Sequence, residues 1–290
     1  MARIDIAGIG IEYELTGEVG APAIALTPGG RFPKEAPGIR TFAEALAAGG
    51  RRVLIWDRPN SGASDLCFEG ASESAMQGKI LVSLIRALNL GPTAVAGGSA
   101  GSRTSLFAAA HDPKAISHLI QWWVSGGTLS LMSLGSAYCC EPAIAASIGG
   151  MAAVAKQPMW AYYLQSSEVN RARFLALDTA AFIATMARWA EAFVPSASAP
   201  VPGMAPEAFA RLTMPVLIFR GSKQDLYHPA WVCERLAELV PHAKLLDPPW
   251  TEQEFVQRQI EAGRTGTGHF LDWPLLAPAI LKFTSRPVGQ

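Results

Sequence analysis

The fold is decided by residues 93–102, which read Thr93-Ala94-Val95-Ala96-Gly97-Gly98-Ser99-Ala100-Gly101-Ser102. The run Thr93–Ala96 predicts a strand, and Ser102–Ala110 has the composition of a helix. Between them, Gly97 to Gly101 match the G-x-S-x-G pattern of a serine on a sharp strand-to-helix turn. A Cβ at either flanking position would collide with neighbouring backbone, so both positions need glycine. The pattern predicts that the turn lifts the Ser99 hydroxyl out of the sheet.

Strands and helices alternate on both sides of this turn. Residues 3–6 and 9–15 predict a short antiparallel pair at the start. Further strands are predicted at Ala23–Thr27, Arg52–Trp56, Ile116–Val124, Pro215–Arg220 and Ala243–Leu246, and further helices at Thr41–Ala48, Glu73–Leu90, Ala230–Val240 and Leu275–Thr284. This alternation predicts an α/β fold with a mostly parallel sheet and helices on both faces.

The alternation is interrupted between about Thr128 and Leu212. This stretch has no convincing strand, only helical segments rich in Ala, Met and aromatic residues. We expect a helical cap (lid) at 128–212, inserted between two strands of a core domain formed by 1–127 and 213–290. Such a cap would cover the carboxyl edge of the sheet, where α/β proteins bind ligands.

The chain is identified here as resembling the α/β-hydrolase superfamily, and the resemblance runs along almost its whole length. Gly97–Ser102 looks like the nucleophile turn of proline-iminopeptidase-type members, and Trp56–Asp65 is similar to the family's D-x-R-G-x-G-x-S segment. Pro59-Asn60 stand where that segment usually has glycine. The resemblance implies an α/β-hydrolase fold and a catalytic triad in the chain order serine, acid, histidine.

A serine hydroxyl needs a base within hydrogen-bond reach and a group that orients the base. Asp225 is the expected acid, because Gly221–Asp225 follows a predicted strand and resembles the family's G-x-x-D turn. His269 is the expected base, since Gly268-His269-Phe270 is similar to the family's G-H-F. His228 is set aside as too close in sequence to Asp225 to bridge to Ser99. The other histidines, His111, His118 and His242, are placed at the wrong edge of the sheet.

The oxyanion hole is expected to use the N–H groups of Ala100 and Gly30. The family usually reads H-G-x in the second loop, whereas this chain reads Pro28-Gly29-Gly30-Arg31. The loss of that histidine leaves open which group supports the loop. Candidate substrate-binding residues are Arg31 beside the oxyanion hole, Trp123 at the start of the cap, and two large apolar residues within it, Met151 and Trp160.

Composition narrows the remaining possibilities. Lys+Arg and Asp+Glu are equal at 24 each and no polybasic tract occurs, which argues against nucleic acid as a partner. The four cysteines have no metal-ligand spacing, so we expect reduced thiols, no metal and no cofactor. No signal-peptide pattern or sufficiently long apolar run is evident, so the expectation is a cytoplasmic protein without a membrane partner. A homodimer is compatible with the sequence.

These features predict a serine hydrolase that forms an acyl-enzyme. The aromatic and Met content of the cap favours a neutral, fairly bulky ester, lactone or related carbonyl compound as the small-molecule substrate. A proline-iminopeptidase-like aminopeptidase and a C–C bond hydrolase use the same triad and stay open as alternatives. A non-catalytic ligand-binding protein of the same fold is the alternative from another class.

Overall fold

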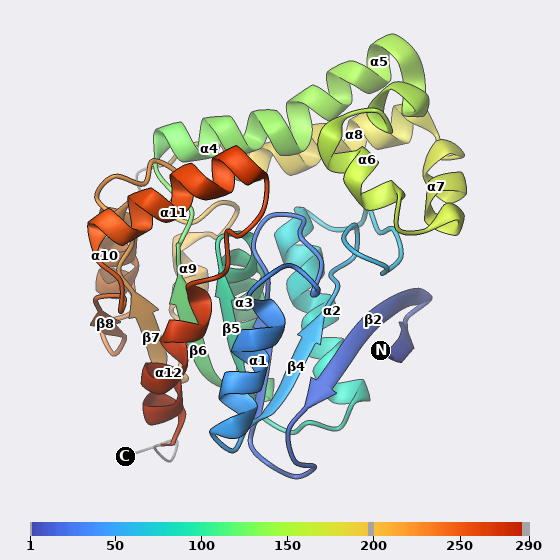
Figure 1. Ribbon diagram of the computed structural model, residues 1–290. Helices are drawn as coiled ribbons and strands as arrows, with labels where there is room; N and C mark the ends of the chain where they lie inside the picture. The colour runs from blue at the N-terminus through green and yellow to red at the C-terminus, as the bar shows by residue number, and fades with distance from the viewer. Residues whose placement is uncertain (1, 197–199, 286–290) are drawn as a thin grey trace.

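The computed structural model describes residues 2–196 and 200–285. Residue 1, residues 197–199 of the expected cap and residues 286–290 of the expected core lie outside the described residues. The chain forms an eight-stranded sheet in the order β1-β2-β4-β3-β5-β6-β7-β8 (Figure 1). The pairs β1·β2 and β2·β4 are antiparallel and the other pairs are parallel. The prediction of a mostly parallel α/β sheet is confirmed.

Strand bounds agree closely with the apolar runs of the sequence. The central strands are covered by helices on both faces, so they read as continuous apolar segments rather than alternating ones. The strands are β1 Ala2–Ile6, β2 Ile9–Thr16, β3 Ala23–Thr27, β4 Arg52–Trp56, β5 Thr93–Gly98, β6 Ile116–Trp122, β7 Val216–Phe219 and β8 Lys244–Leu246.

Two hydrophobic cores lie on the two faces of the sheet. One core packs α1 (Ile39–Ala48) and α12 (Ala277–Thr284) against the strands, with Phe42 and Ile280 fully buried. The other core packs α2 (Glu73–Ala87), α3 (Ala100–His111) and α10 (Ala230–Leu239) against the opposite face. Burial on both faces holds the carboxyl ends of β3, β5, β6 and β7 at one edge of the sheet.

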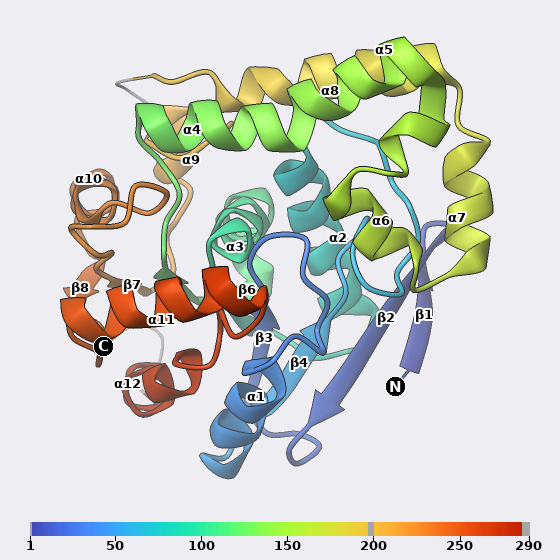
Figure 2. The same ribbon diagram turned by 45° about the horizontal axis from the view of Figure 1, so that its top comes forward.

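In the described residues between β6 and β7, the regular secondary structure is helical, and loops connect the helices. Figures 1 and 2 show α4, α5 and α8 lying across one edge of the sheet, with α6 and α7 descending toward β2. This arrangement agrees with a cap over that edge, and the domain limits at 127/128 and 212/213 stay predictions. The cap helices are α4 Thr128–Gly135, the π-helical turn Ser136–Cys140, α5 Glu141–Val154, α6 Pro158–Leu164, α7 Glu168–Leu175, α8 Thr179–Ala190 and α9 Pro206–Phe209.

One helical stretch of the cap, Thr128–Leu164, is long and apolar enough to cross a membrane by length and composition. The sequence pattern predicts no such run. Only 33% of the most apolar window of this stretch is buried: Leu131, Tyr138, Met151 and Trp160 are buried within the protein, whereas Leu129, Met132, Ile144 and Ile148 are exposed.

A helix that the sequence reading omitted lies between β8 and the loop that carries His269. This helix, α11 (Glu252–Thr265), begins at a capping box in which Thr251 and Glu254 bind each other's backbone N–H, and it ends at Gly266 with a left-handed backbone. The pattern Thr251-x-x-Glu254 is the signal that could have revealed it. In Figure 2, α11 crosses in front of the sheet below α4.

Candidate functional site

Ser99 stands at the turn from β5 to α3 in a left-handed conformation, with φ 57° and ψ −121°. Its N–H donates to the carbonyl of Trp123 at 3.0 Å, which fixes the turn to the end of the neighbouring strand. A Cβ at Gly97 would strike the backbone of Gly101, and a Cβ at Gly101 would strike the carbonyls of Thr27 and Pro28. The two glycines are therefore required by close backbone approach, as the sequence predicted. A non-glycine residue with positive φ is strained, and such strain is frequent at active sites.

The Ser99 hydroxyl is joined to an imidazole and a carboxylate by hydrogen bonds. His228 Nε2 lies 2.9 Å from Ser99 Oγ, and His228 Nδ1 lies 2.8 Å from Asp225 Oδ2. The other oxygen, Asp225 Oδ1, accepts the backbone N–H groups of Tyr227 (2.8 Å) and His228 (3.1 Å). These bonds form a continuous chain from a serine to a histidine to a carboxylate.

The charge state of Asp225 follows from its surroundings. Burial alone would raise the pKa of the carboxyl, but the hydrogen bonds from the His228 ring and from two backbone N–H groups outweigh burial and lower the pKa. An ionised carboxylate only accepts hydrogen bonds, so the nitrogen facing it, Nδ1, carries the ring proton. His228 Nε2 is then free to accept the Ser99 proton.

The histidine bound to Ser99 is thus His228, and the expectation of His269 at that position is corrected. Sequence spacing alone predicts that His228, only three residues after Asp225, cannot reach the serine. The turn closed by Asp225 Oδ1 brings the imidazole against its own acid and leaves Nε2 pointing to Ser99. The spacing D-x-x-H is the sequence signal for this arrangement, because an Asp side chain can accept backbone N–H groups two and three residues later and so close a turn.

His269 lies at the same end of the molecule without a hydrogen bond to Ser99. Because α11 intervenes after β8, the chain returns to the site only at Gly266, and the His269 ring packs beside Phe32 with centroids 5.6 Å apart. Burial lowers the pKa of this imidazole. The remaining histidines lie elsewhere: His111 is exposed, His118 packs against Phe283, and His242 contacts the Met214 carbonyl.

Trp123, which is expected to contact substrate, packs on the ring of His228. Its indole stacks on the His228 ring with centroids 5.6 Å apart and planes 21° apart. The indole is itself held by Trp273 and Phe255. Trp123 therefore fixes His228 through its ring and Ser99 through its carbonyl.

The loop that should supply the second oxyanion donor is held by Arg58. Its Nη2 donates to the carbonyls of Gly29 (3.1 Å), Gly30 (2.7 Å) and Phe32 (3.4 Å). This fully buried guanidinium supplies the loop support that the sequence left open. Gly30 has a positive φ of 49°. With its carbonyl held by Arg58, the Gly30 N–H has no acceptor among the described residues, and the same is true of Ala100 N–H.

A mostly apolar cavity of about 420 Å³ adjoins this loop. A Cβ at Gly29 would lie 3.2 Å from Ser99 Cβ, and the next residue, Gly30, lines the cavity. Ser99, His228 and Asp225 are not themselves among its lining residues. Its described lining contains no carboxylate. The lining residues are Gly30, Arg31, Phe32, Ala36, Pro37, Tyr138, Pro158, Met159, Tyr162, Gly266, Thr267, Gly268, His269 and Phe270.

Of the other residues expected to bind substrate, one lines this cavity and two are buried in the protein. Arg31 lines the cavity. Trp160 is buried directly beneath it, with the Arg31 guanidinium 4.4 Å from the indole centroid. Met151 is buried in the hydrophobic core and is not among the lining residues. Met159 and Tyr162, which lie close to Trp160 in the chain, line the cavity where Met151 and Trp160 were expected.

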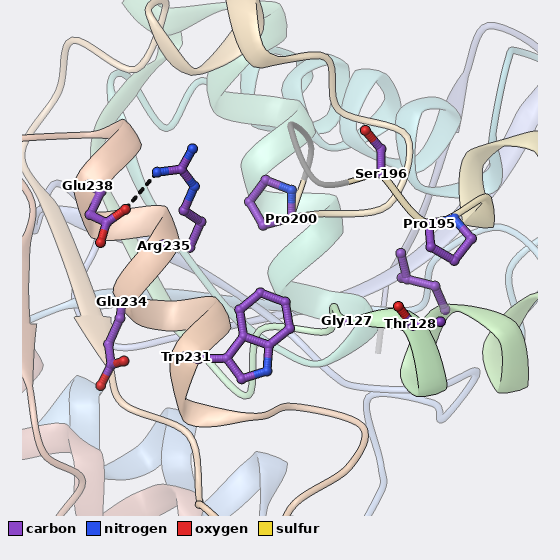
Figure 3. Close-up of a pocket in the computed structure, with 10 residues that line it drawn as sticks. Gly127, Thr128, Pro195, Ser196, Pro200, Trp231, Glu234, Arg235 and Glu238 are labelled. Carbon is purple, nitrogen blue, oxygen red and sulfur yellow. Dashed lines mark hydrogen bonds and ion pairs between the residues drawn. The ribbon is translucent and has the colours of Figure 1, made fainter.

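A second cavity, of about 500 Å³, lies between α10 and the start of α4 (Figure 3). Trp231, Glu234, Arg235 and Glu238 face it, and Arg235 and Glu238 form an ion pair at 2.6 Å. None of Ser99, His228 and Asp225 lines this cavity. Among the described residues, no group of three or more His, Cys, Asp or Glu is placed to hold a metal ion.

Comparisons with known proteins support the fold. No family model matches the chain, and no curated protein matches it. Among solved structures, the enol-lactonase from Burkholderia xenovorans LB400 is 17% identical with a TM-score of 0.60, over 98% of this chain and 100% of the other. An N-acyl homoserine lactone degrading enzyme, Est816, is 19% identical with a TM-score of 0.58, over 97% and 99% of the two chains. E-2-(acetamidomethylene)succinate hydrolase is 17% identical with a TM-score of 0.59, over 98% of each chain.

At these identities the likeness concerns the fold. The topology of the sheet, the turn at Ser99 and the agreement over nearly the whole length of both chains show an α/β-hydrolase fold.

Proposed function

We propose that this protein is a serine hydrolase that cleaves esters or lactones through an acyl-enzyme, with Ser99 as nucleophile, His228 as base and Asp225 as orienting acid. The observation that carries the proposal is the hydrogen-bond chain from Ser99 Oγ to His228 to Asp225, at 2.9 and 2.8 Å. A cavity lined by Gly30, and the N–H groups of Gly30 and Ala100, which have no acceptor in the described part of the chain, also support acyl transfer.

The proposed reaction has two halves. Ser99 Oγ attacks the carbonyl carbon while its proton passes to His228 Nε2, and the Gly30 and Ala100 N–H groups bind the oxyanion. The bond to the leaving oxygen then breaks, and that oxygen takes the proton from His228. Water next attacks the acyl-enzyme with His228 as base, releasing the acid and restoring Ser99. Every step uses groups of this chain and water.

The cavity favours esters and lactones over peptides with a free N-terminus. An aminopeptidase must hold a cationic amine, for which a carboxylate is the usual partner. The described lining of the cavity has no Asp or Glu and includes the cation Arg31. C–C bond hydrolysis uses the same triad, and a panel of esters, lactones, aminoacyl arylamides and β-diketones would separate these reactions.

The proposal is tested with a fluorophosphonate probe and ester hydrolysis. Labelling should occur in the wild type and vanish in Ser99→Ala. His228→Ala should lower kcat/KM by at least about a hundredfold, the range for loss of a general base. His111→Ala, at an exposed histidine far from the site, is the matched control and should retain activity.

The variant His269→Ala, compared with His228→Ala, decides which of the two histidines is the general base. We expect a smaller loss than in His228→Ala, because His269 lines the cavity without contacting Ser99. If His269→Ala abolished turnover while His228→Ala left it intact, the base would be His269. A wild type that neither reacts with the probe nor hydrolyses any ester would favour a ligand-binding protein of this fold.

A further inference from the structure

Three buried arginines gather beside the candidate site around one carboxylate. Arg31, Arg58 and Arg103 are each at most 6% exposed, and Glu73 is the carboxylate that pairs with Arg31. Burial lowers the pKa of Arg103 and lowers that of Arg58 to about 10, while Glu73 and Tyr138 act in the opposite sense on both. Because an arginine side chain keeps its proton in proteins, three buried positive charges meet in this region.

The positive charge of these arginines is only partly balanced by neighbouring carboxylates. Glu73 accepts from Arg31 Nε (3.2 Å) and Nη2 (3.1 Å) and so balances one guanidinium. The next carboxylate, Asp57, lies 3.4 Å from the Lys34 ammonium, which also pairs with Glu35, and Asp57 acts on the Arg58 charge as well. The four cations therefore face three carboxylates, Glu73, Asp57 and Glu35, which leaves one positive charge in excess. Arg58 binds only the neutral carbonyls of the oxyanion loop, and its Nε has no partner.

Arg103 donates to two hydroxyl groups, those of Ser74 (3.3 Å) and Ser125 (2.8 Å), which are also neutral. Uncompensated buried charge is costly, and a bound anion is the usual compensation.

Arg31 is the member of this group that reaches the cavity. Its Nη1 faces the sulfur of Met159 at 3.1 Å, a weak acceptor, and both residues line the cavity. The guanidinium is held by Glu73 on one edge and lies over the rings of Trp160 and Tyr138, at 4.4 and 4.9 Å from their centroids. A cation fixed in this way presents an N–H edge to the ligand without having to be ordered on binding.

We propose that the cavity binds substrates carrying a carboxylate, which Arg31 receives through Nη1 while the ester or lactone carbonyl lies at Gly30 and Ser99. This inference rests on the proposed function and revises the expectation of a neutral substrate. Because Gly30 and Arg31 are adjacent in the chain, the reacting carbonyl and the carboxylate belong to one compact molecule. The apolar walls, including Phe32, Met159 and Tyr162, receive the carbon chain between them.

The test compares p-nitrophenyl hydrogen glutarate, which has a free carboxylate, with its methyl ester, p-nitrophenyl methyl glutarate. The enzyme-free release of p-nitrophenol is subtracted for each, because the free carboxylate accelerates it by intramolecular attack. In the wild type, kcat/KM should favour the anionic ester by about tenfold or more, the effect of a hydrogen bond to a charged group. The variant R31M/E73Q removes the Arg31 cation together with its partner carboxylate, so that no unpaired Glu73 is left buried. In this variant the ratio of kcat/KM values should fall to about one. The succinate and adipate pairs locate the preferred chain length.

A matched variant and a binding measurement complete the design. R86M/D112N removes another ion pair, on α2 and after α3, that does not line this cavity, and its ratio should equal that of the wild type. In Ser99→Ala, calorimetry should show monomethyl glutarate binding about tenfold or more tightly than dimethyl glutarate, with the difference lost when R31M/E73Q is added.

The outcomes separate the two proposals. Probe labelling of Ser99 together with a wild-type ratio near one, or a ratio unchanged in R31M/E73Q, would overturn the carboxylate site and leave the hydrolase. Selective binding of the monoester without probe labelling or turnover would overturn the hydrolase and leave the carboxylate site.

Discussion

At the scale of single residues, the Asp225 side chain performs two tasks with its two oxygens. Oδ1 closes the turn over Tyr227 and His228, and Oδ2 holds the imidazole proton. In Asp225→Asn the amide can still close the turn, but the NH₂ group would face Nδ1. The ring would then carry its proton on Nε2 and could no longer accept from Ser99. We expect kcat to fall by up to about 10⁴-fold with KM little changed, as measured with a chromogenic ester.

The same variant should alter the stability of the protein in acid. The pKa of Asp225 is lowered in the folded state from an ordinary 3.8, so the unfolded chain binds the proton more readily. The carboxylate therefore stabilises the fold above the unfolded pKa, and this contribution is lost as pH falls through the folded pKa. Urea unfolding should show the wild type more stable than Asp225→Asn near pH 6, with the difference shrinking below about pH 4. A pH-independent difference would contradict this origin.

At the scale of elements, the oxyanion loop depends on the fully buried Arg58, which holds three of its carbonyls. In Arg58→Met those carbonyls lose their donor and the Gly30 N–H loses its fixed direction. We expect kcat to fall by roughly ten- to a hundredfold, somewhat less than for complete loss of an oxyanion donor.

Arg51→Met is the control, since Arg51 is also buried and binds α12 at the other end of β4. Both variants should be destabilised, but Arg51→Met should keep the labelling rate. Equal loss of labelling in both would mean that Arg58 acts only through stability.

The elements also show what the sequence could and could not reveal. β3 and β4 were predicted with their observed bounds, because strands buried on both faces leave unbroken apolar runs. The glycines around Ser99 predicted the turn that carries it, because backbone approaches them closely. By contrast, α11 is mostly polar and buries only Phe255 and Ala262, so its apolar pattern is weak in the sequence. The position of His269 was misjudged as a result.

The choice of base could not be made from sequence spacing. Whether His228 or His269 reaches Ser99 depends on a turn of two hydrogen bonds at Asp225 and on the path of the chain after β8. The arginine cluster was equally hidden, because Arg31, Arg58 and Arg103 lie far apart in the sequence and meet only through tertiary packing.

At the scale of the whole molecule, the cap is fastened to the core at Ser64. The carbonyl of Ser64 accepts from the hydroxyl of Tyr163 on α6 and from Nδ2 of Asn170 on α7, both at 2.9 Å. In Tyr163→Phe the carbonyl keeps one of its two donors. We expect the free energy of unfolding to fall by about 1 kcal/mol, and limited proteolysis to cut faster within 128–196. Tyr162→Phe is the control, because the Tyr162 side chain is about half exposed and should change neither quantity.

The stretch that receives the cap is the stretch that holds the oxyanion loop. Ser64 anchors Tyr163, and Arg58, six positions earlier in the chain, grips Gly29 and Gly30. The cap and the oxyanion loop are thus connected through one short segment, residues 58–64. A ligand that displaces α6 would shift the segment that carries Arg58, and with it the orientation of the Gly30 N–H. The fit of a ligand beneath the cap would therefore influence the activation barrier for reaction at its carbonyl.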